Sequence, residues 1–179
     1  MGLNAMKTGE YLNLLRELYL AHFDMEKNKE ILGQQFDLYA FCEVKNEKYI
    51  AHQSLKIYSY KDYEHCVVEL QTVFDGSNLT REFFQNCVEE LIEIDNQHHQ
   101  TYLTYVIAVD QGVSGEQAAF VRNFKFSKSY WLGLKGWCDL RLILVDLQSH
   151  KVYSNKKGKE VADKYNPDWL KARVDEIYG

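Results

Sequence analysis

The sequence predicts an α+β fold whose β-sheet is mixed and largely antiparallel. Apolar residues recur at helical spacing near the start of the chain and again in its middle, whereas other stretches are rich in β-branched and aromatic residues. Three extended stretches follow the first helix with only short polar turns between them, which indicates an antiparallel meander. The 179 residues include one proline, so no proline-rich linker divides the chain, and we expect a single domain over residues 1–179.

The first half of the chain is predicted to form a helix, the three strands of the meander and a second helix. Thr8 can cap the first helix and Thr80 the second, whose apolar residues share one face. A further edge strand could lie within residues 25–32. The expected ranges are 8–22 for the first helix, 36–44, 49–60 and 63–73 for the strands, 45–48 and 61–62 for the turns, and 80–92 for the second helix.

The second half is predicted to alternate between strands and short helices. The strand over 101–109 is apolar on both faces, so we expect it in the middle of the sheet. Ser114 opens a short helix that reaches residue 121, and Asn166 caps a C-terminal helix over about 167–178, which could be appended to the domain. The other expected elements are strands over 124–131, 137–147 and 151–154 and a helix over 160–165. Alternation over 124–131 places its aromatic rings in the core.

Composition excludes several classes of protein. The chain has 21 lysines and arginines against 26 aspartates and glutamates, a formal charge of −5, which makes duplex DNA an improbable partner. No run could span a membrane and no signal peptide is evident, so we expect a cytoplasmic protein without a membrane partner. The sequence leaves open whether the protein forms a homo-oligomer. Four widely spaced cysteines form no C-x-x-C pair, which favours reduced core thiols: Cys42, Cys66, Cys87 and Cys138.

A basic turn over residues 155–160 is the first candidate site. It contains Lys156, Lys157 and Lys159 around a glycine, between a predicted strand and a short helix. Lysines and backbone amides in such a turn suit an anionic or phosphorylated ligand. The spacing is not that of a P-loop, and a solvated lysine turn is the simpler interpretation.

Arg141 is a weaker candidate for the same ligand. It lies within an otherwise apolar predicted strand. The structural alternative is that Arg141 is buried and paired with a carboxylate, for which we consider Asp139 or Asp37.

Strand-end carboxylates are the second candidate. Asp110 and Asp146 each end an apolar strand, and Asp139 enters one, so neighbouring acids could hold a divalent metal or perform acid–base chemistry. Aspartate also ends strands because it forms Asx turns, an account that requires no ligand.

The order of elements is also that of restriction-endonuclease-like nucleases, which need a carboxylate and an acid-x-lysine triplet at one metal. Glu43 and Lys45 fit the triplet and Asp37 the carboxylate, but six residues of strand place Asp37 roughly 20 Å from Glu43. Glu69, with Asp62 as a partner, matches more loosely and meets the same objection.

No nucleophile motif of a hydrolase is present, and no cofactor motif either, so we expect no cofactor and favour a protein that is not an enzyme. The leading interpretation is a binding or regulatory protein for an anionic or phosphorylated ligand. The alternatives are a metal-dependent hydrolase or divergent nuclease, and a protein-interaction module.

The second half of the chain resembles an uncharacterised bacterial domain family of similar length, and the resemblance extends to the first helix. It implies a cytoplasmic bacterial protein and assigns no catalytic residue. The segments that carry the resemblance are residues 36–39, 128–130, 136–147 and 155–160, the last two reading G-W-C-D-L-R-L-I-L-V-D-L and N-K-K-G-K-E.

Overall fold

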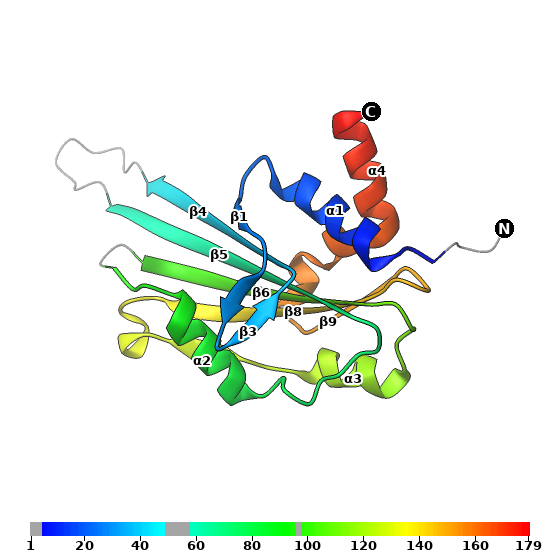
Figure 1. Ribbon diagram of the computed structural model, residues 1–179. Helices are drawn as coiled ribbons and strands as arrows, with labels where there is room; N and C mark the ends of the chain where they lie inside the picture. The colour runs from blue at the N-terminus through cyan, green and yellow to red at the C-terminus, as the bar shows by residue number, and fades with distance from the viewer. Residues whose placement is uncertain (1–4, 49–57, 96–97) are drawn as a thin grey trace.

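The structure is a computed structural model that describes residues 5–48, 58–95 and 98–179. One twisted sheet runs through the molecule, with helices on both of its faces (Figure 1). Its strands lie in the order β1 (Asp24–Glu26), β4 (Leu38–Lys48), β5 (Tyr58–Gln71), β6 (His98–Val109), β8 (Trp137–Asp146) and β7 (Ser127–Ser129), and β9 (Lys151–Ser154) also pairs with β8. A separate hairpin joins β2 (Lys29–Ile31) to β3 (Gln34–Phe36).

The sheet is mixed, as predicted. The central pairs β5/β6 and β6/β8 are parallel, because a helix carries the chain back between the paired strands, and the flanking pairs are antiparallel. The predicted α+β fold with a mixed, largely antiparallel sheet is therefore confirmed. β6 lies between two parallel neighbours, which explains why its sequence is apolar on both faces.

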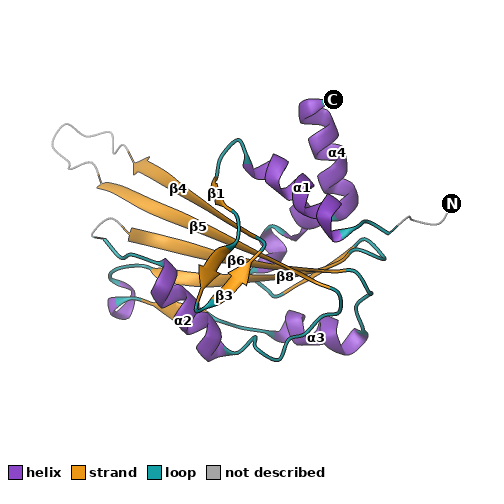
Figure 2. Cartoon of the chain, viewed as in Figure 1, coloured by secondary structure: helices purple, strands orange, loops and turns teal. Residues whose placement is uncertain are grey.

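The helices divide between the two faces of the sheet (Figure 2). On one face, α1 (Thr8–Tyr19) packs against α4 (Pro167–Tyr178), and Tyr11, Leu15 and Leu170 are buried there. On the other face lie α2 (Arg81–Leu91) and α3 (Gly115–Asn123), with Phe84 and Val121 in the core. Helical spacing of apolar residues predicted α1 and α2, and capping signals predicted α3 and α4, although α1 ends at Tyr19 rather than at residue 22.

In the described part of the region predicted to be three strands, two strands are present, and each extends into an expected turn. β4 continues through residues 45–48, and β5 through 61–62, where we expected turns. The pairing of β5 with β6 shifts register between Lys61 and Asp62, so the polar pair lies at an irregularity of the ladder and not at the end of a strand. Most of the expected middle strand, residues 49–57, lies outside the described residues.

Two other segments form a different type of secondary structure from the one predicted. The predicted strand over 124–131 is reduced to β7, and a 3₁₀ turn, η1 (Trp131–Gly133), follows it. Phe126 is buried as expected, but Trp131 is 74% exposed. The predicted helix over 160–165 is two 3₁₀ turns, η2 (Gly158–Glu160) and η3 (Ala162–Tyr165).

Three of the four predicted side-chain caps are present; the exception is Thr8, which is the first residue of α1, and the N-cap Lys7 makes no side-chain hydrogen bond. Thr80 accepts from the backbone of Phe83, and Ser114 forms a complete capping box with Gln117. Asn166 accepts from the first turn of α4.

No helix among the described residues is long and apolar enough to cross a membrane.

Candidate functional site

The basic turn is fixed to the edge of β8 by one buried side chain, Asn155. β7 begins opposite Asp139 and β9 ends opposite Ile143, so the edge of β8 between these two positions needs other partners. Asn155, which is 3% exposed, supplies them: its Oδ1 accepts from the backbone N–H of Leu142 at 3.1 Å, and its Nδ2 donates to the carbonyl of Leu140 at 2.9 Å. The side-chain amide thus provides the hydrogen bonds that the backbone of a neighbouring strand would provide to β8.

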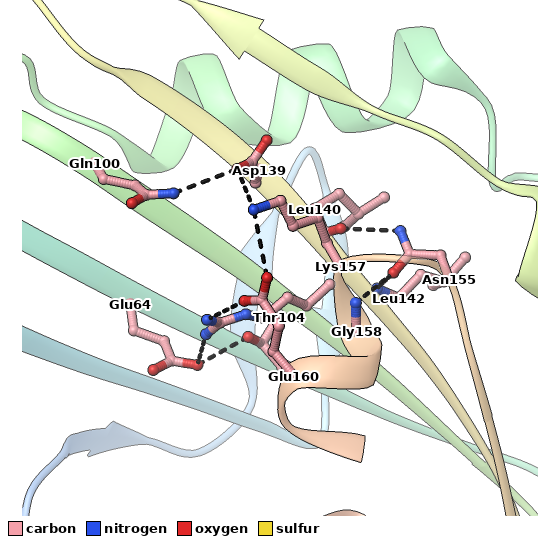
Figure 3. Close-up of polar contacts among 11 residues, drawn as sticks. Glu64, Gln100, Thr104, Asp139, Leu140, Leu142, Asn155, Lys157, Gly158 and Glu160 are labelled. Carbon is pink, nitrogen blue, oxygen red and sulfur yellow. Dashed lines mark hydrogen bonds and ion pairs between the residues drawn. The ribbon is translucent and has the colours of Figure 1, made fainter.

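Gly158 allows this turn to lie against the strand. Its N–H donates to the same Asn155 Oδ1 at 2.7 Å, as Figure 3 shows. A Cβ at this position would stand 2.9 Å from the Leu142 carbonyl and 2.9 Å from Cδ1 of Ile143. The close approach therefore requires glycine, because the atoms that a Cβ would meet include backbone.

Five charged side chains form one continuous network where the basic turn meets the sheet (Figure 3). Arg141 donates to Glu64 at 3.1 Å and to Glu160 at 3.0 Å. Lys157 lies 3.4 Å from Glu160 and 3.3 Å from Asp139. These charges come from two strands and the turn, and they alternate in sign along the chain of contacts, so each one is compensated.

Arg141 is the buried centre of this network. Its side chain is 9% exposed, and the guanidinium lies 3.5 Å from the centre of the Tyr102 ring. Thr104 donates to the same Glu64 oxygen at 2.9 Å. The expectation that Arg141 is buried and paired is confirmed, but its partners are Glu64 and Glu160, not Asp139 or Asp37. Asp37 instead accepts from the backbone of Leu70 at 2.8 Å.

The network shifts the protonation equilibria of the two side chains that the turn contributes. Partial burial alone would lower the pKa of Lys157, but the Asp139 and Glu160 carboxylates outweigh it and raise that pKa above its ordinary value. Partial burial would raise the pKa of Glu160, yet the hydrogen bond from Arg141 and the charge of Lys157 lower it. Both shifts favour the charged forms of Lys157 and Glu160.

A cleft of about 310 Å³ opens beside this network, and we call it the basic cleft. Four cations line it together with a single carboxylate, that of Asp139, which leaves three net positive charges. Among the described residues, Lys125 and Lys156 take part in no ion pair. The lining residues are Arg81, Phe124, Lys125, Phe126, Ser127, Asp139, Leu140, Asn155, Lys156 and Lys157.

The structure divides the residues predicted to bind an anion. Lys156 and Lys157 line the basic cleft, whereas Lys159 is exposed and does not contribute to its lining. Arg141 is linked to Lys157 through Glu160 and does not line the cleft.

Sequence reasoning missed two cations of the basic cleft. Arg81 begins α2 and Lys125 follows α3, and a hydrogen bond from Arg81 Nη1 to the Lys125 carbonyl, 3.3 Å long, joins them. Glu64, which pairs with Arg141, was also missed. No local pattern could identify these residues, because strand pairing and the crossover helices bring them to the turn.

The predicted metal-binding acids are dispersed. Asp139 and Asp146 are seven residues apart on β8, which separates them by roughly 23 Å. Asp146 accepts from the backbones of Val113, Gln148 and Ser149, the arrangement that the Asx-turn account predicted. Asp110 is exposed at the end of β6. Within the described ranges, no group of three or more histidines, cysteines, aspartates or glutamates could hold a metal ion.

The nuclease candidates have partners of other kinds. Glu43 lies 3.6 Å from Lys61 and Asp62 lies 2.9 Å from His99, while Glu69 accepts from the Tyr105 hydroxyl at 2.8 Å. Lys45 lies inside β4 and not in a turn. The strand predicted over 63–73 is part of β5, which is continuous through the expected turn at 61–62.

Comparison with known proteins agrees with the resemblance to an uncharacterised domain family. Neither the curated proteins nor the solved structures contain a match to this chain. A family model matches residues 7–167, which is most of the chain. The chain therefore belongs to the family described as domain of unknown function DUF8052.

Proposed function

We propose that this protein is a binding protein for a small anionic ligand, phosphorylated or carboxylated, which it holds in the basic cleft. One observation carries the proposal. Arg81, Lys125 and the pair Lys156–Lys157 come from three separate segments and converge on one cleft, in a chain whose net charge is −5. Like charges brought together by tertiary structure repel one another, and an anion between them offsets that repulsion.

The lining also suggests the form of the ligand. Phe124, Phe126 and Leu140 supply apolar surface beside the cations, and Ser127 adds a hydroxyl. The volume of about 310 Å³ is at the small end of the range for ligand pockets. A compact molecule with an apolar body and one phosphate or carboxylate group fits these features better than a polyanion such as duplex DNA.

The charged network gives the cleft a defined geometry. Lys157 is held between Asp139 and Glu160, and Arg141 holds Glu160 from the other side. Arg141 is thus a positioning residue, because it acts on the ligand only through Glu160 and Lys157. Lys156 has no such restraint among the described residues and can turn towards an anion.

Calorimetric titration with phenyl phosphate, and with inorganic phosphate for comparison, tests the proposal. The double variant Lys125→Glu/Lys156→Glu removes two cations that have no ion-pair partner in the described structure, so it should fold as the wild type does. We expect at least tenfold weaker binding of phenyl phosphate. The control is Lys159→Glu, a single charge reversal outside the cleft with half the change in net charge, which should change the affinity less than twofold.

Two results would contradict the proposal. One is the lack of saturable binding of either phosphate by a wild-type protein whose thermal unfolding is cooperative. The other is equal weakening by the double variant and by Lys159→Glu, which would indicate an effect of net charge and not of the basic cleft.

A further inference from the structure

The loop between β7 and β8 exposes three large apolar side chains within four residues. Trp131 is 74% exposed, Leu132 100% and Leu134 88%, the highest values among the exposed large hydrophobic residues of the described structure. We call residues 131–134 the apolar loop. A residue that is fully exposed has no neighbouring surface against it, so the loop protrudes and does not line a groove. In Figure 1 it lies at the end of the sheet away from α1 and α4.

The apolar loop is nevertheless ordered by its own backbone. Tyr130 pairs with Gly136 across the base of the loop, its N–H donating to the Gly136 carbonyl at 2.9 Å. Within the loop, Gly133 donates to Tyr130 at 2.9 Å and Leu134 to Trp131 at 3.0 Å. The three apolar side chains are therefore exposed on a hydrogen-bonded turn, and their exposure does not result from a frayed segment.

The backbone of this turn is strained at two residues with side chains. Trp131 has a φ of 49° and Leu132 a φ of 54°, in the left-handed region that favours glycine or asparagine. Leucine thus occupies a position where it has neither packing contacts nor a favourable backbone conformation. Such strain is typical of functional segments.

We propose that the apolar loop inserts into the interface of a lipid bilayer. Three side chains expose a few hundred Å², enough to mark an interaction surface but less than the roughly 800 Å² that each partner buries in a stable protein complex. A lipid surface needs no complementary shape and accepts a protruding loop. Tryptophan favours the membrane interface, and leucine the hydrocarbon beneath it.

Lysines flank the loop in a manner that suits insertion. Lys135 Nζ lies 5.7 Å from the centre of the Trp131 ring, and Lys128 is on the preceding strand. A lysine can extend its ammonium group to the headgroups while its stem accompanies the apolar side chains. Lys128 is also paired with Glu89 at 2.8 Å. We therefore expect apolar burial, and not attraction to anionic lipid, to dominate the binding.

This proposal revises the expectation that the protein has no membrane partner. That expectation came from the lack of a run that could span a bilayer, whereas a loop that lies at the interface requires no such run. The proposal does not depend on the basic cleft, and each can fail without the other.

Co-sedimentation with vesicles of phosphatidylcholine tests it, together with tryptophan emission. The double variant Leu132→Asn/Leu134→Asn removes two fully or nearly fully exposed side chains, and asparagine tolerates the φ of residue 132, so folding should be retained. We expect the wild type to sediment with the vesicles and its emission to shift to shorter wavelength. The double variant should partition at least tenfold less, and Trp131→Phe should abolish the shift.

The Lys125→Glu/Lys156→Glu variant serves as the matched control and should partition as the wild type does. Three results would overturn the proposal. The wild type fails to bind the vesicles; or it binds only when they contain anionic phosphatidylglycerol; or the same leucine substitutions abolish self-association in the absence of lipid, which would assign the loop to a second copy of this chain.

Discussion

Asn155 completes the edge of β8 with a side chain. Its amide serves two backbone groups of the strand and the N–H of Gly158, all of them buried. A buried backbone group that loses its hydrogen-bond partner lowers the stability by the full cost of removing it from water. A hydrogen bond that is intact adds only modestly to the stability. The importance of this residue therefore lies in what its absence would leave unpaired.

We expect Asn155→Ala to destabilise the protein by about 2–4 kcal/mol, because it leaves two backbone N–H groups and one carbonyl without a partner. Chemical denaturation monitored by circular dichroism measures the change. Thr80→Ala is the control, since it removes only the side-chain cap at the exposed start of α2 and should cost only about 1 kcal/mol. Equal losses in the two variants would contradict the role assigned to Asn155.

At the scale of elements, the turn over residues 155–160 shows how a polar segment can be a structural one. Its lysines suggested a solvated or ligand-binding turn, and Lys156 and Lys159 are indeed exposed. Asn155 and Gly158 are buried and lie against β8. A local pattern cannot distinguish these roles, because burial depends on which surface the segment meets.

Gly158→Ala tests the docking of this turn. The added methyl group would meet the Leu142 carbonyl and Ile143, so the turn must move away from β8 at a cost of about 1–3 kcal/mol. The measurement is the free energy of unfolding in urea. Gly9→Ala in α1 is the matched control: its Cβ would meet nothing within 4 Å, and the substitution should leave the stability unchanged or slightly higher. A neutral Gly158→Ala would mean that the turn is not tightly docked.

At the scale of the whole molecule, the sheet joins groups that respond to pH in separate ranges. His65 is buried on β5, and burial lowers its pKa to about 4 from the ordinary 6.5. Tyr39 lies within hydrogen-bonding distance of its Nδ1, at 2.8 Å. The folded protein therefore holds a neutral imidazole where the unfolded chain would take up a proton.

Acid should thus destabilise the protein well before its carboxylates are protonated. Because the folded pKa of His65 lies below the unfolded value, its contribution is lost as the pH falls from 6.5 towards about 4, by about 3 kcal/mol in all. We expect His65→Gln to flatten the pH dependence of the urea midpoint in that range.

Glu160→Gln tests a group whose contribution to stability changes in a second, more acidic pH range. The lowered pKa of Glu160 gives stability that is present above its ordinary value of 4.5 and is lost as the pH falls through the lowered value. This variant should be less stable than the wild type at every pH above about 4.5, and the difference should shrink only in the most acidic part of the profile. A wild-type midpoint that stays constant between pH 6.5 and 4.5 would contradict the assignment of His65.

The sequence by itself determined the helices, the strand composition of the sheet and the caps at Thr80, Ser114 and Asn166, because periodicity and capping depend on neighbours a few residues away. Tertiary structure decided which charges meet. The partners of Arg141 come from β5 and from the turn after β9, and the basic cleft adds Arg81 and Lys125 from two other segments. It also decided that Trp131 and Leu132 face solvent, since an apolar pattern does not specify whether another surface covers it. Pairing between distant strands sets these contacts, and no local pattern carries that information.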